Sequence, residues 1–172
     1  AAYVMMAWRV AYCKVFYPLA YYCAYFSIRA DAFDYEKMAM GRERLEYYLD
    51  IYKAKKADGT IEKTELDEYK DMRIVQEMYA RGYEFTPIDI YKAKARSFQI
   101  IDGKIMPSFK VVSKIGESAG ESIEIAARGG KFLSKDDLRQ RAKIGQTVID
   151  KLSELKLLDG MAESNQLSLF DV

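Results

Sequence analysis

Hydrophobic side chains along most of the chain recur at the three- or four-residue spacing of amphipathic helices. One such stretch begins near Asp34 and stops at Gly59. Its predicted inner side carries Met38, Leu45, Leu49 and Tyr52. A second stretch runs from about Thr64 to Ala80 and ends at Gly82. Its predicted inner side carries Leu66, Tyr69, Met72, Val75, Met78 and Tyr79.

The run from residue 1 to residue 28 is rich in apolar side chains, and its length raises the question of a membrane span. Basic residues interrupt it, Pro18 breaks the helix, and its many tyrosines suit the hydrocarbon core poorly. We therefore expect two buried helices, residues 3–17 and 19–27, and no membrane contact. Because the first helix has no cap and the chain has no initiating methionine, we expect a piece of something longer.

After Tyr83 the pattern changes to β-branched and aromatic residues. Asp102-Gly103 separates two short apolar runs, residues 98–101 and 104–106, and this arrangement is a strong signal for a β-hairpin with a type I′ turn. The chain is therefore predicted to be mainly α with one small hairpin.

Two units with helical spacing follow the hairpin, and each has the tripeptide Lys-Ile-Gly directly before a helix. The first predicted helix runs from about residue 117 to 128 and is closed by Gly129-Gly130. The second runs from about residue 146 to 155. A short helix is expected between these two helices, and Ser134 and Asp137 predict a capping box at its start.

Composition removes several classes of enzyme. The chain has no histidine, which excludes classical catalytic triads and zinc-hydrolase motifs. Cys13 and Cys23 lie in the apolar run, where we expect reduced core residues. The net charge of +1 neither indicates nor excludes a local basic patch.

The two Lys-Ile-Gly turns are the candidate site. Each places a glycine, Gly116 or Gly145, before a helix N-terminus, where amide groups without intrahelical partners and the helix dipole favour a phosphate. The candidate backbone-binding residues are Lys114, Ile115, Gly116, Glu117 and Ser118 in the first turn and Lys143, Ile144, Gly145, Gln146 and Thr147 in the second. The alternative is that each glycine only closes a tight corner, and the acidic neighbours Glu117 and Glu121 favour that alternative.

The last third of the chain resembles the C-terminal end of a known protein family, the PolC-type alpha subunit of bacterial DNA polymerase III. The resemblance is carried by FKVVSKIGESAGESIEIAARGGKFLSKDDLRQRAKIGQTVIDKLSELKLLDG and by the NQLSLF that follows it. That end of the family is a tandem helix-hairpin-helix region. The stretch YPLAYYCAYFSIRADAFD resembles the late fingers region of the same family, and the resemblance is continuous over essentially the whole chain.

The resemblance implies a cytoplasmic, template-directed DNA polymerase in which palm aspartates hold two Mg²⁺ ions. This chain has no Asp-x-Asp pair on a predicted strand, so we expect no catalytic residue, no metal site and no cofactor in it. The implied partners are duplex DNA, a sliding clamp and the remainder of the polymerase chain. The implied domains are residues 1–82 (end of the helical fingers domain), 83–107 (bridge with the hairpin), 108–160 (tandem helix-hairpin-helix region that binds duplex DNA) and 161–172 (flexible tail).

The ending NQLSLF looks like the clamp-binding peptide of that family. Its predicted clamp contacts are Gln166, Leu167, Leu169 and Phe170. The alternative is that the apolar residues fold back onto Leu157 and Leu158 and complete the core.

One departure from the family pattern affects both turns. Helix-hairpin-helix turns usually read glycine, apolar residue, glycine, and here Lys114 and Lys143 replace the first glycine. The lost flexibility argues against close backbone approach, whereas the added charge favours phosphate. A rival hypothesis is a protein-interaction module in which the two units are only a scaffold.

Overall fold

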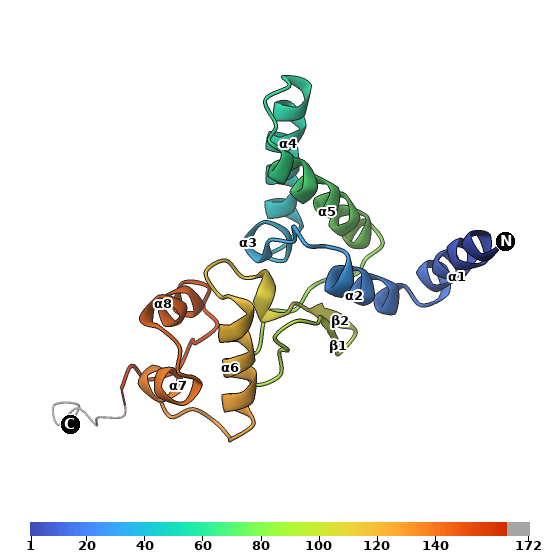
Figure 1. Ribbon diagram of the computed structural model, residues 1–172. Coiled ribbons are helices and arrows are strands. Elements are labelled where there is room, and N and C mark those ends of the chain that lie inside the picture. Colours follow the sequence, from blue (N-terminus) through green and yellow to red (C-terminus); the bar gives the residue numbers. More distant parts are fainter. Residues whose placement is uncertain (165–172) are drawn as a thin grey trace.

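The chain is mainly helical with one hairpin, as the sequence predicts, in a computed structural model that describes residues 1–164 (Figure 1). The first helices are α1 (Ala2–Phe16), α2 (Pro18–Ile28), α3 (Tyr35–Met38), α4 (Arg42–Ala57) and α5 (Lys63–Ala80). Next come the antiparallel strands β1 (Gln99–Ile101) and β2 (Lys104–Met106) and the 3₁₀ helix η1 (Phe109–Val111). The last helices are α6 (Glu117–Ala127), α7 (Lys135–Ala142) and α8 (Gln146–Glu154).

The helices form distinct regions around the hairpin. Helices α4 and α5 pack against each other as one arm, and the hairpin lies beside α2 (Figure 1). Helices α6, α7 and α8 gather at the end of the molecule away from α1 (Figure 1). The two predicted turns therefore belong to one helical lobe.

A cluster of phenylalanines joins the helical first half to the hairpin region. Phe26 and Phe33 come from the first half, and Phe85 and Phe98 come from the segment that leads into β1. Their ring centroids lie between 5.1 Å (Phe33 to Phe98) and 6.4 Å (Phe85 to Phe98) apart, and all four rings are buried. Burial of this much aromatic surface fixes the hairpin region against α2.

Local sequence signals placed most elements correctly. The four residues predicted for the inner side of the stretch from Asp34 to Gly59 are all buried, but the stretch forms two helices instead of one. The chain turns at Gly41, which has φ of 109° and therefore cannot continue a helix. In the hairpin, Asp102 and Gly103 have φ of 51° and 75°, which is the type I′ geometry predicted for this pair.

The first N-terminal helix is exposed, and the expectation that both N-terminal helices are buried is wrong for it. Helix α1 buries no side chain, whereas α2 buries Tyr22 and Phe26. Cys13 is exposed on α1 and Cys23 is half-buried on α2, so the expectation of two core cysteines is also wrong, although both thiols are free. The physical reason is that the apolar face of α1 meets no complementary surface within the described part of the chain.

Polar contacts attach the end of α1 to the body. The Lys14 ammonium lies 2.8 Å from the Glu77 carboxylate on α5, and Arg81 donates a hydrogen bond of 2.9 Å to the Lys14 carbonyl. Among residues 1–164, no helix combines the length and the apolar character needed to cross a bilayer.

The first residues of the predicted tail, up to residue 164, are hydrogen-bonded to the start of α7. The carbonyls of Ala162 and Glu163 accept hydrogen bonds of 2.8 and 3.1 Å from the Lys135 and Asp136 amides at the start of α7. A helix start needs such acceptors, because its first amides have no intrahelical partner. The remainder of the predicted tail lies outside the described residues.

Candidate nucleic-acid interface

The two Lys-Ile-Gly turns have the same backbone conformation. Lys114 and Lys143 have φ of 65° and 52°, in the left-handed region that glycine usually occupies. Gly116 and Gly145 follow with φ of −66° and −75°, and each is the N-cap of its helix. Both lysines therefore adopt a backbone conformation that glycine would favour at this position.

A buried isoleucine fixes each turn to the body of the lobe. Ile115 is 2% exposed and Ile144 is 8% exposed. The Ile115 amide donates to the Val112 carbonyl at 3.1 Å, and the Ile144 amide donates to the Arg139 carbonyl at 3.2 Å. The residues on either side of each isoleucine are exposed, so each turn presents its backbone to solvent.

The amides that follow each isoleucine have no acceptor within residues 1–164. No hydrogen bond to a described atom is made by the amides of Gly116, Glu117, Ser118, Gly145, Gln146 and Thr147. The neighbouring helix α7 differs, because the Ser134 hydroxyl accepts from the Asp137 amide at 3.1 Å and the chain after residue 161 covers the preceding amides. The starts of α6 and α8 therefore leave groups of outward donors for an external acceptor.

The predicted capping box at Ser134 is only half formed. The Asp137 carboxylate accepts from the Leu133 amide at 3.0 Å rather than from the Ser134 amide.

Neither the backbone conformation nor the packing of the chain explains the glycines at positions 116 and 145. Their φ values are ordinary for any residue, and a Cβ atom added at either position would meet no heavy atom within 4 Å. Space in front of both turns is therefore open. A group outside the described chain that approaches the backbone closely would require glycine there.

Arg96 offsets the acidic neighbours of the first turn. Its guanidinium lies 2.6 Å from the Glu117 carboxylate and 2.7 Å from the Glu121 carboxylate. The hydrogen bond that Arg96 donates to the Glu121 carboxylate is the largest cause that raises the pKa of Arg96. The charges of Glu117 and Glu121 are therefore directed to Arg96, which weakens the argument that they exclude a phosphate.

The two lysines of the turns keep their charge available. Lys114 and Lys143 are exposed, and neither forms an ion pair with any residue in the described range. In the second turn the Gln146 amide group donates to the Asp150 carboxylate at 2.8 Å. Each set of five predicted residues is thus brought together in one turn, with lysine, glycine and free amides on the exposed side.

The residues predicted to contact a clamp, Gln166, Leu167, Leu169 and Phe170, lie outside the described residues. Sequence reasoning also missed Arg96, whose partner Glu121 is 25 residues away in the chain. No local pattern connects positions so far apart.

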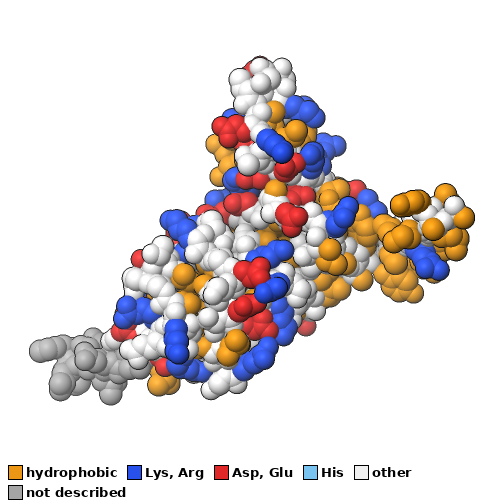
Figure 2. Space-filling model, viewed as in Figure 1, with side chains coloured by type: hydrophobic (Ala, Val, Ile, Leu, Met, Phe, Trp, Pro, Cys, Tyr) orange, Lys and Arg blue, Asp and Glu red, His pale blue; other side chains and the backbone are white. Residues whose placement is uncertain are grey.

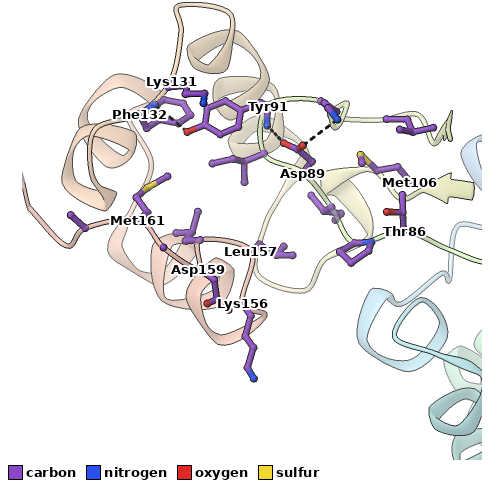
Figure 3. Close-up of a pocket in the computed structure, with 18 of the residues that line it drawn as sticks. Thr86, Asp89, Tyr91, Met106, Lys131, Phe132, Lys156, Leu157, Asp159 and Met161 are labelled. Atoms are coloured by element: carbon purple, nitrogen blue, oxygen red, sulfur yellow. Dashed lines mark hydrogen bonds and ion pairs between the residues drawn. The ribbon is translucent and has the colours of Figure 1, made fainter.

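A separate cavity of about 720 Å³ lies between the segment 86–92, the hairpin and the turn after α8 (Figure 3). Tyr91 and Phe132 stack beside it with ring centroids 5.6 Å apart, and the Tyr91 hydroxyl accepts from the Phe132 amide at 3.1 Å. Asp89, one of the aspartates that line the cavity, accepts a hydrogen bond of 2.8 Å from the Tyr91 amide. None of the predicted backbone-binding residues lines this cavity.

Residues 1–164 contain no group of three or more histidine, cysteine, aspartate or glutamate side chains arranged to hold a metal ion.

Comparison with known proteins adds a family assignment. A family model described as helix-hairpin-helix motif matches residues 82–167.

Curated relatives match nearly the whole chain. DNA polymerase III PolC-type of Streptococcus pneumoniae serotype 2 is 42% identical over 171 residues, which is 99% of this chain and 12% of the relative. The proteins of the same name from Streptococcus suis and Streptococcus sanguinis are 44% and 41% identical over the same shares. The chain thus spans only 12% of the length of these relatives. The resemblance drawn from the sequence is confirmed: the chain belongs to the helix-hairpin-helix family and is similar, over nearly its whole length, to one part of PolC-type DNA polymerase III.

Proposed function

We propose that the two turns grip the sugar-phosphate backbone of duplex DNA, without reading its sequence. One observation carries the proposal: both turns combine unpartnered amides with a glycine that the fold itself does not need. Amides at a helix N-terminus bind phosphate, and such contacts position a protein on DNA without sequence information. The exposed Lys114 and Lys143 add charge at the same places.

The duplex-binding part belongs, in this proposal, to a cytoplasmic replicative polymerase that transfers nucleotides under the direction of a template. The polymerase names of the relatives and the helix-hairpin-helix match support this assignment. A polymerase of this family uses Mg²⁺ ions, but the carboxylates of the described residues do not form a site that fits them. In this proposal the segment contributes binding, and catalysis belongs elsewhere in the polymerase.

The remainder of the polymerase chain is the proposed partner of the N-terminal helices, as the end of a fingers domain. On α1, Tyr3 is 90% exposed and Trp8 and Phe16 are 64% and 63% exposed. Figure 2 shows the apolar side chains gathered over this end of the molecule. An apolar surface of this kind marks an interface. Residues 83–107 then bridge this part to the duplex-binding residues 108–160.

Replacing Lys114 with glycine tests the contribution of its charge without disturbing the turn. Glycine adopts the left-handed conformation more easily than lysine, so the free energy of unfolding should not fall. The magnitude of the slope of log affinity against log salt concentration should fall by about 1, because one phosphate contact loses its cation. Fluorescence anisotropy with a labelled duplex at several salt concentrations measures the slope, and urea unfolding followed by circular dichroism measures the free energy of unfolding.

Lys114→Arg is the matched control, because it keeps the charge and should keep the slope. A duplex of scrambled sequence should bind equally well. Unchanged affinity and slope in Lys114→Gly and in Lys143→Gly would refute the role of the lysines. If the unmodified chain ignored DNA altogether, the rival hypothesis of a protein-interaction scaffold would replace the proposal.

We propose further that the ending from Gln166 to Phe170 binds a sliding clamp. The observation in its favour is the anchoring just before it, where the Lys135 ammonium lies 2.6 Å from the Glu163 carboxylate and α7 holds the backbone. The peptide thus continues from a defined point on the lobe. A few buried apolar side chains supply most of the binding affinity of such peptides.

Replacing Phe170 with alanine should weaken clamp binding about tenfold, because one apolar anchor is lost. Surface plasmon resonance on immobilised clamp measures the dissociation constant. Ser168→Ala is the control, since Ser168 is not among the predicted clamp contacts. Equal losses in both variants, or a fall in thermal stability, would favour the alternative in which the ending packs on Leu157 and Leu158.

A further inference from the structure

Glu36 lies on α3, outside the region matched by the helix-hairpin-helix model, yet one of its oxygen atoms contacts both units. The Ser113 hydroxyl donates to Glu36 Oε1 at 3.1 Å, and Ser113 directly precedes the first turn. The Lys151 ammonium on α8 lies 2.5 Å from the same Oε1. The first turn and the helix that follows the second turn therefore meet at a single carboxylate.

The contact with α8 is buried and charged. The Lys151 side chain is only 5% exposed, and its other partner, Glu154, is 60% exposed. Hydrogen bonds from Lys151 and Ser113 outweigh the burial of Glu36 and lower the pKa of its carboxyl. Hydrogen bonds to Glu36 and Glu154 likewise outweigh burial and raise the pKa of Lys151. A buried ammonium without its principal partner is strongly unfavourable. Separation of α8 from Glu36 would leave the Lys151 ammonium in that state, so the ion pair holds α8 against Glu36.

We propose that Glu36 is a positioning residue that holds the two phosphate-binding turns at a fixed separation. The inference rests on the proposed function of the turns. Two contacts with one duplex reinforce each other only when the separation of the turns matches that of the phosphates. Glu36, which lies outside the two units, acts as a brace: its contacts with Ser113 and Lys151 fix that separation before DNA binds. Less conformational entropy is then lost on binding.

The brace itself is testable without DNA, by the distance between two spin labels. The labels are placed at Ser118→Cys and Thr147→Cys, both exposed in the first turns of α6 and α8, with Cys13 and Cys23 replaced by serine and alanine. Dilution with unlabelled chain suppresses distances between molecules. The full chain should give a narrow distribution of distances, and Glu36→Ala should give a broad one.

The second measurement is duplex affinity in the same full chain. Glu36→Ala should bind about tenfold more weakly, because the two turns no longer act together. Gly145→Glu, which blocks the second turn, should cause a similar loss. The double variant should lose little more than either single variant, because each change removes the same cooperation between the turns.

Two further variants keep the result interpretable. Glu36→Gln has the same size and still accepts from Ser113, so it should fold even if Glu36→Ala does not, and its distance distribution should broaden less. Glu46→Ala removes an equal charge from an exposed pair with Arg42 on α4 and should change neither measurement.

The two measurements separate the possible failures. A narrow distance distribution in both Glu36→Ala and Glu36→Gln, or losses of affinity that add in the double variant, would overturn the positioning role. If Gly145→Glu bound DNA as well as the unmodified chain, the proposed function would fail, and the spin-label distances would still decide whether Glu36 braces the lobe.

Discussion

Duplex binding is expected to fall roughly 100-fold at low salt in a chain that carries Gly116→Glu and Gly145→Glu together, counting about 1.4 kcal/mol for each turn. Each new carboxylate would stand directly in front of amides that have no acceptor among residues 1–164. It would compete with a phosphate for those amides and repel it. The loss should be the same for duplexes of any sequence, because the turns contact no bases.

The same double variant should remain as stable as the unmodified chain. A side chain at either position enters open space, and the φ values of −66° and −75° suit any residue. A negative charge at a helix N-terminus also interacts favourably with the helix dipole, by about 0.3–1 kcal/mol at an exposed site. Thermal unfolding followed by circular dichroism measures the stability, and fluorescence anisotropy measures the affinity.

The matched control is the pair Gly116→Ala and Gly145→Ala, which adds two methyl groups and no charge. It should lose less affinity than the glutamate pair, since only the closest approach of the phosphate is hindered. Unchanged affinity in the glutamate pair, with the chain folded, would mean that neither turn contacts DNA.

Local sequence patterns predicted most helices and the hairpin of this fold. The predictions that failed depend on contacts between residues far apart in the chain. The alternation around Asp102-Gly103 specifies the hairpin because the turn type depends on those two residues alone. The exposure of α1 could not be predicted, because its apolar pattern is the same whether its partner lies within or beyond the described residues. A helix tolerates a single glycine at moderate cost, so the presence of Gly41 does not by itself predict that the helix ends there. Its φ of 109° therefore had no clear signal in the sequence.

The candidate site divides in the same way. The repeated Lys-Ile-Gly tripeptide located both turns, because helix starts have local signals. The left-handed conformation of Lys114 and Lys143 has no signal in the sequence, since a lysine seldom adopts it. Arg96 and Glu36 act on the first turn from other elements of the fold, and no spacing rule connects them to it.

Arg141 is expected to be the most important single side chain for the stability of the lobe. Its guanidinium donates to the carbonyls of Ala126 at 2.8 Å, Gly130 at 3.1 Å and Lys131 at 3.1 Å, just where α6 ends. It also lies 4.5 Å from the centroid of the Phe132 ring. The side chain therefore ties the end of the first unit to α7 in the second.

Replacing Arg141 with methionine should lower the free energy of unfolding by about 3 kcal/mol, because carbonyls at the end of α6 lose a charged donor and the ring loses its cation. Urea unfolding followed by circular dichroism measures the change. Arg128→Met is the control, since that side chain is 69% exposed and its pair with Glu124 on the same helix should contribute less than about 0.5 kcal/mol. A loss in Arg141→Met no larger than in the control would contradict the structural role.

Gly129 allows a sharper test of the same contact. A Cβ at this position would stand 2.9 Å from Arg141 Nη2, and the carbonyls that hold the guanidinium prevent it from moving aside freely. Gly129→Ala should therefore be destabilising in the unmodified chain. In the Arg141→Met background the obstacle is more flexible and is no longer held by hydrogen bonds, so the same substitution should cost less. A double-mutant cycle measures the difference, and a coupling free energy below about 0.5 kcal/mol would show that the guanidinium is not fixed against α6 in solution.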